Sequence, residues 1–96
     1  SHANRCASEL ALELSAIPGV DVVWPVQASE IFMVMPKATA SVLRQAGAEF
    51  SEWYASALPP GFALRDDQAF IRLVTSFVTE EDQIWQFVSL ARESAG

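Results

Sequence analysis

Apolar residues near the start of the chain recur with the spacing of one helix face. They follow the i, i+3, i+4, i+7 pattern, while Glu9 and Glu13 fall on a different face of the same helix. The spacing therefore predicts an amphipathic helix over residues 4 to 17, which Pro18 and Gly19 end. The apolar positions of this helix are Ala7, Leu10, Ala11, Leu14 and Ile17.

Two apolar runs follow, and each is bounded by a proline. Residues 20 to 24 predict a short strand, and Pro25 indicates that it lies at a sheet edge, because proline cannot donate to the ladder. Residues 30 to 35 (EIFMVM) are apolar on both faces, which is typical of a central, covered strand. Pro36 ends this second strand.

A second helix is predicted over residues 37 to 46, where good helix formers dominate. Val42, Leu43 and Ala46 lie on one side of this helix. Gly47 follows at the position where a helix terminator usually stands.

A strand, a loop and a hairpin are predicted for the next part of the chain. Residues 49 to 54 (EFSEWY) alternate imperfectly and predict a strand, and residues 56 to 61 (SALPPG) predict a loop. Residues 62 to 65 are expected to form a short strand, followed by a turn at residues 66 to 67 and a return strand over residues 69 to 77.

The C-terminal part carries a strong helix start. Thr79 can cap a helix, and the acidic residues 80 to 82 favour the positive end of the helix dipole. The apolar stripe expected to be buried in this last helix consists of Ile84, Phe87, Val88 and Ala91.

The order of these elements predicts one α+β domain over residues 1–96. We expect a three- to four-stranded, mostly antiparallel sheet with helices packed on one face. Hydrophobic residues make up 51% of the chain, with three Trp and six Phe, which is high for a small domain with much surface. Some of this apolar surface is therefore expected to face a partner, either another copy of the chain or another domain of a longer chain.

Charge and chain composition exclude several classes of protein. The net charge is −6 and no basic run is present, so nucleic acid is a poor partner. No apolar stretch approaches the ~20 residues that span a bilayer, and no signal region is visible, so we expect a cytoplasmic chain without membrane contact. The lone cysteine, Cys6, is expected to be a small packing residue of the first helix and not a reactive thiol.

Few side chains have the spacing that catalysis or metal binding needs. His2 is the single histidine and has no neighbouring ligands, so no metal site is expected. Asp66 and Asp67 are adjacent in a predicted turn and therefore fit a turn better than an acid–base pair. Lys37, the single lysine, is expected to be solvated in the first turn of a helix.

Arg72 stands out because apolar residues flank it in the predicted strand FIRLV. Burial of a guanidinium is costly unless an anion meets it. One interpretation is an edge-strand arginine that reaches water or pairs with a surface acid. The other is a fork that receives a carboxylate in two parallel hydrogen bonds.

Several stretches resemble the low-specificity L-threonine aldolases, which are pyridoxal-phosphate enzymes of fold type I. IRLVTSFVTEED is similar to the C-terminal end of that family. HANRCASELALELSAIPGVDVVWPVQASEIFMVMPK and RQAGAEFSEW are similar to segments that precede it. Nearly the whole chain is covered, and RLVTSF, with its spacing to AIPGV and WPV, is the most specific part.

The resemblance implies that the chain is the C-terminal small domain of a longer enzyme. Its partner would be an N-terminal domain of the same chain that holds the pyridoxal phosphate, the Schiff-base lysine and the other cofactor ligands. Arg72, at the RLVT position, would bind the carboxylate of the amino-acid substrate, and no catalytic or cofactor-binding residue lies in this segment. Ser76 stands where some members have histidine, which marks a subgroup.

The chemistry that the resemblance implies is retro-aldol cleavage of threonine, or a related β-hydroxy-α-amino acid, to glycine and an aldehyde. The parent enzyme would be a homo-oligomer, and the 96 residues alone would not be catalytic. Two alternatives remain open at this stage. One is the small domain of another fold-type I enzyme, such as an aminotransferase or a β-eliminating lyase, and the other is a free-standing α+β interaction module.

Overall fold

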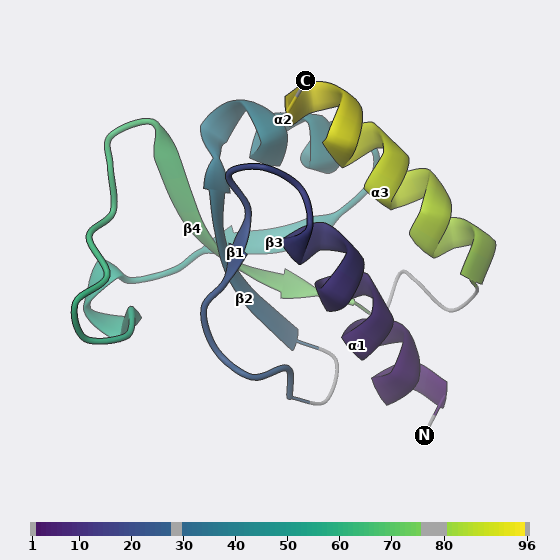
Figure 1. Cartoon of the computed structure of the whole chain (residues 1–96), viewed down its shortest axis with the longest axis horizontal. Coiled ribbons are helices and arrows are strands. Elements are labelled where there is room, and N and C mark those ends of the chain that lie inside the picture. The colour runs from purple at the N-terminus through teal and green to yellow at the C-terminus, as the bar shows by residue number, and fades with distance from the viewer. Residues whose placement is uncertain (1, 28–29, 76–80, 96) are drawn as a thin grey trace.

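The computed structural model describes residues 2–27, 30–75 and 81–95, and it has the expected alternation of helices and strands (Figure 1). The elements in chain order are α1 (His2–Ser15), β1 (Asp21–Val22), β2 (Glu30–Pro36), α2 (Lys37–Gln45), β3 (Glu49–Glu52), the 3-10 turn η1 (Ala55–Ala57), β4 (Gln68–Val74) and α3 (Glu81–Ala95).

The four strands found in the described residues form one antiparallel sheet in the order β1-β2-β4-β3. The long strands β2 and β4 occupy the centre, where both faces can be covered, and their seven residues pair along their full length. The predicted edge position of the first strand and the predicted central position of the second are confirmed. β2 carries apolar residues on both faces, and it has a neighbouring strand on each side, β1 and β4.

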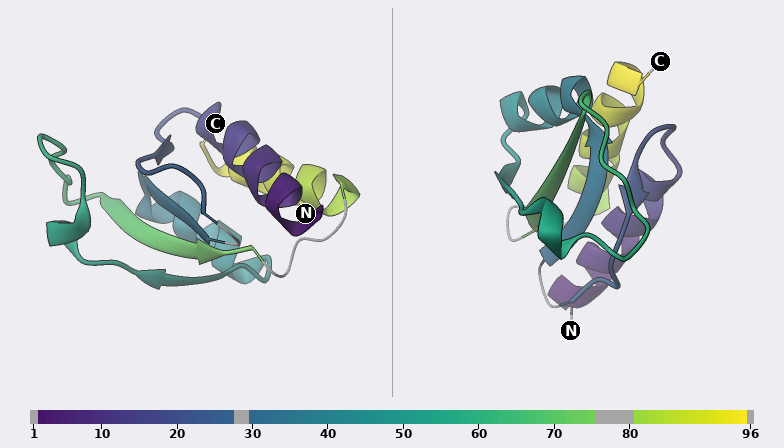
Figure 2. Two further views of the ribbon diagram at one scale, coloured as in Figure 1. Left: turned by 90° about the horizontal axis from the view of Figure 1, so that it is seen from below. Right: turned by 90° about the vertical axis from the view of Figure 1, so that its left-hand side faces the viewer.

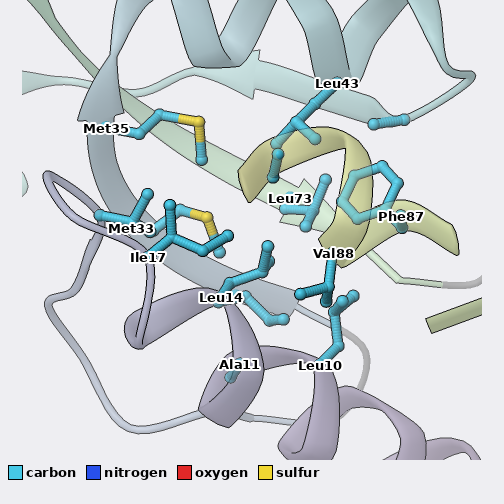
Figure 3. Close-up of a cluster of buried hydrophobic side chains, with 14 of the residues drawn as sticks. Leu10, Ala11, Leu14, Ile17, Met33, Met35, Leu43, Leu73, Phe87 and Val88 are labelled. Carbon is cyan, nitrogen blue, oxygen red and sulfur yellow. The ribbon is translucent and has the colours of Figure 1, made fainter. Parts of the chain in front are cut away.

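Helices lie over one face of the sheet, as Figure 2 shows most clearly for α1 and α3. Between the helices and the sheet is a continuous apolar core, to which α1, α2, α3, β2 and β4 contribute (Figure 3). The largest wholly buried side chains in it are Leu10, Leu14, Ile31, Met33, Met35, Leu43, Ile71, Leu73, Ile84 and Val88. The predicted α+β class is confirmed.

Each predicted helix is present, with small differences in its ends and its buried side. The first begins before residue 4 and ends at Ser15, ahead of the turn in which Gly19 adopts a φ of 85°. In the second, Leu43 is buried and Val42 half-buried. Ala46, predicted to be the last residue of this helix, lies one position past its end and is exposed.

The stripe predicted for the last helix is confirmed, since all four of its apolar residues are buried. Cys6 is also buried in α1, as expected. Thr79 and Glu80, predicted to start the last helix, lie outside the described residues.

The predicted hairpin is wrong. Residues 62 to 65 form no strand and are largely exposed, and a turn in which the Gln68 amide donates to the Arg65 carbonyl leads directly into β4. The turn at residues 66 to 67 is confirmed. β4 is apolar on both faces, so it is stabilised more by insertion between β2 and β3 than by pairing with a short exposed segment. The end of the predicted return strand, residues 76 to 77, lies outside the described residues.

No helix in the part of the chain that the structure describes is long and apolar enough to cross a membrane.

Candidate functional site

Arg72 lies at the middle of the sheet, on the face that the helices leave uncovered. Successive side chains of a strand point to opposite faces. Ala69, Ile71 and Leu73 belong to the core under the helices, so Arg72 points the other way. The register places Phe32 of β2 and Ser51 of β3 directly opposite Arg72.

Glu30 is the acidic partner of Arg72. It pairs in register with Val74 and therefore lies diagonal to Arg72 on the same face, within reach of a long side chain. Arg72 Nε donates to Glu30 Oε1 at 3.0 Å, and Arg72 Nη2 donates to the same oxygen at 2.6 Å. The two side chains keep 30% and 37% of their surface exposed, so the ion pair is accessible to solvent and to a ligand.

Aromatic rings border Arg72 on its other side. The guanidinium carbon lies 5.3 Å from the centre of the Trp53 ring, at a distance typical of a cation–π contact. The Trp53 ring meets the Phe32 ring edge-on, with centroids 5.8 Å apart, and Phe32 also contacts Phe70. Arg72 therefore lies between a carboxylate and an aromatic cluster, and we call Arg72, Glu30, Phe32 and Trp53 the Arg72 site.

The electrostatics keep Arg72 charged. The hydrogen bonding that Arg72 donates to Glu30 raises the pKa of Arg72 above its ordinary value. Partial desolvation lowers this pKa, and the negative charge of the Glu30 carboxylate raises it. The site thus presents a permanent, partly shielded cation flanked by apolar surface. Such an arrangement can bind an anionic group with planar, two-point geometry, of which a carboxylate is the simplest.

The two interpretations of Arg72 from the sequence are each modified by the structure. The edge position is wrong, since β4 lies between β2 and β3, although the expected acidic partner is found. Sequence reasoning missed Glu30 and Trp53. Glu30 is the one charge in its strand, which marks it as unusual, but its diagonal relation to Arg72 follows only from the strand register.

The other candidates do not join this site. Asp67 forms an exposed ion pair with Arg65 at 3.6 Å, and Asp66 shares the same exposed turn, which agrees with the turn interpretation. Lys37 is exposed at the start of α2, as expected. Within residues 2–27, 30–75 and 81–95 no cluster of metal-ligating side chains is present. Ser76 lies outside the described residues.

The known proteins to which this chain is similar are threonine aldolases. No family model matches the chain. A low-specificity L-threonine aldolase of a Pseudomonas species is 36% identical over 56 residues, which are 58% of this chain and 16% of that protein. The low-specificity L-threonine aldolase of Pseudomonas aeruginosa is 39% identical over 49 residues, which are 51% of this chain and 14% of that protein.

The fold has a solved counterpart in the threonine aldolase of Leishmania major. The TM-score is 0.70 at 24% identity, and the match covers 99% of this chain and 25% of that one. The resemblance identified from the sequence is therefore confirmed. The chain spans less than one fifth of the length of the two curated relatives.

The described residues do not fit pyridoxal phosphate, the cofactor implied by the resemblance. Lys37, the chain's single lysine, lines a hollow with α2 residues and with Phe50 and Ala69, which belong to the helix-covered side of the sheet. Arg72 lies on the opposite face. A ligand at Arg72 would therefore lie on the other side of the sheet from Lys37.

Proposed function

We propose that this chain is the C-terminal small domain of a threonine-aldolase-like lyase. Its role there is to bind the substrate carboxylate through Arg72 and to pack against the cofactor-binding domain of the same chain. The partial coverage of the relatives supports a domain of a larger protein. The observation that carries the proposal is the position of Arg72, which is charged, accessible and on the sheet face free of helices.

The reaction we assign to the complete enzyme is cleavage of threonine, or a related β-hydroxy-α-amino acid, to glycine and an aldehyde. Pyridoxal phosphate would be held by the large domain, where it supplies the electron sink for the bond cleavage. The residues of this chain contribute positioning. By fixing the carboxylate in a planar fork, Arg72 sets the orientation of the substrate's α-carbon, and orientation of this kind lowers the barrier.

The same proposal sets the cellular context. We place the enzyme in the cytoplasm, as a homo-oligomer. The high share of apolar residues and several large exposed apolar side chains agree with an oligomer. Those outside β3 and its following segment are Leu12 on α1, Trp24 after β1, and Trp85 and Leu90 on α3.

The test is the Arg72→Lys variant of the complete enzyme, assayed by aldehyde release from threonine. Lysine offers a point charge in place of a planar fork, so we expect a higher KM and a loss of kcat/KM of about 10-fold or more. The matched control is Arg65→Lys, which changes an arginine that is exposed and paired only with Asp67 among the described residues.

Unchanged kinetics in Arg72→Lys would remove Arg72 from the substrate site. Release of a keto acid in place of an aldehyde by the wild-type enzyme would contradict the aldolase assignment and favour an aminotransferase or eliminating lyase of the same fold type.

A further inference from the structure

Glu30 contacts only one edge of the Arg72 guanidinium. A guanidinium has two edges that can each receive an acceptor, one formed by Nε and Nη2 and the other by Nη1 and Nη2. Glu30 Oε1 accepts from both nitrogens of the first edge. Among the described residues, Nη1 has no hydrogen-bond or ion-pair partner.

The ring of Trp53 lies over the guanidinium, so the plane of Arg72 is restrained from a second direction. An arginine side chain otherwise samples many rotamers, and ordering it costs conformational entropy on ligand binding. Glu30 lies in β2 on one side of β4. Trp53 directly follows β3 on the other side, and its amide donates to the Phe70 carbonyl of β4 at 2.8 Å. The fork is thereby oriented before any ligand arrives.

We propose that Glu30 is a positioning residue that holds the Nε edge of Arg72, so that the Nη1–Nη2 edge receives the substrate carboxylate. The proposal rests on the function proposed above and specifies how its binding residue is held. Glu30 does not touch the substrate. It contributes by reducing the freedom that Arg72 would lose on binding.

A competing role for Glu30 can be separated from this one. If Glu30 occupied the position of the substrate carboxylate, binding would have to displace it, and removal of Glu30 would strengthen binding. The geometry favours positioning, because both donated bonds converge on one oxygen at a single edge and the other edge is left for a ligand. The partial exposure of Arg72 leaves room for an approaching carboxylate.

The experiment uses the complete, cofactor-loaded enzyme and three variants: Glu30→Ala, Glu30→Gln and the control Glu49→Ala. Glu49 pairs in register with Val74 from the other side of β4, is exposed, and has no contact with Arg72 among the described residues. We expect Glu30→Ala to raise KM for threonine by about 10-fold with kcat changed by less than about 2-fold, because Arg72 is still present to orient the bound substrate and only its ordering before binding is lost.

The glutamine variant retains a carbonyl oxygen that can accept from Nε and Nη2, so it should recover part of the lost affinity. Threoninol, which replaces the carboxylate by a hydroxymethyl group, is the probe for a general structural defect. Its inhibition constant should be the same in wild type and in both Glu30 variants. Thermal unfolding of each variant identifies any that fail to fold, and Glu30→Gln then carries the test.

Three outcomes would overturn the inference: an unchanged KM in Glu30→Ala, a lowered KM, or an equal loss of threoninol binding. If Arg72→Lys impairs the enzyme while Glu30→Ala does not, only the role of Glu30 fails. If neither substitution affects KM, the proposed function of Arg72 fails with it.

Discussion

Thr39 carries a buried hydroxyl for which the described residues offer no hydrogen-bond partner. The residue is 1% exposed and lies on the inner side of α2. A buried hydroxyl without a partner loses its bonds to water and gains none in return.

We therefore expect Thr39→Val to stabilise the protein by about 1 kcal/mol, since valine keeps the shape and has a similar helix propensity. Thr39→Ser, which keeps the hydroxyl and removes the methyl group, should destabilise by a similar amount of about 1 kcal/mol. Urea unfolding of both variants measures the difference, and a valine variant less stable than wild type would reveal a hydroxyl partner.

The sequence alone identifies Arg72 as a candidate ligand-binding residue, but it does not identify the residues that surround Arg72. A charged residue in an apolar strand is visible in the sequence, because it breaks a period-2 pattern. One partner, Glu30, is 42 positions away, and the other, Trp53, directly follows β3. Such proximity is set by strand order and register, which local patterns do not contain.

Among the elements, the turn between α1 and β1 has a requirement for glycine. Gly19 has a φ of 85°, and a Cβ added there would lie 3.2 Å from Cγ of Pro36, at the junction of β2 and α2. Gly61 has nearly the same φ, 86°, but a Cβ there would meet nothing within 4 Å. The two glycines thus share a backbone conformation and differ in their surroundings.

Gly19→Ala and Gly61→Ala should therefore lose different amounts of stability. Both pay for the left-handed conformation, by about 1–2 kcal/mol. Gly19→Ala should lose about a further 1 kcal/mol, because it also crowds Pro36. Chemical denaturation measures each loss, and equal losses would show that the Pro36 contact is relieved by a small backbone shift.

Element positions were predicted well where the pattern was periodic and poorly where it was short. The helical spacing of apolar residues predicts α1, and the acidic residues near the start of α3 predict that helix. The apolar residues on both faces of β2 predict its central position in the sheet. Residues 62 to 65 have too few alternating positions to specify pairing. Nothing local indicates that β4 pairs with β2, more than 30 residues earlier, in preference to residues 62 to 65.

For the whole molecule, the separation of Lys37 and Arg72 onto opposite faces has a direct test. The 96 residues alone should neither bind pyridoxal phosphate nor cleave threonine, because the single lysine cannot approach a ligand held at the Arg72 site. Absorbance titration with pyridoxal phosphate measures binding. A saturable imine absorption that Lys37→Arg abolishes would contradict this expectation.

The order β1-β2-β4-β3 also determines how the Arg72 site comes into existence. Its central pair joins segments that are distant along the chain, so closing the intervening loop costs entropy before any pairing energy is recovered. α2 and β3 lie within that loop, and β3 then completes the sheet on the far side of β4. The Glu30–Arg72 bond, which spans this junction, is consequently a marker of completed folding: a collapsed chain with all its helices but an open central pair cannot form it.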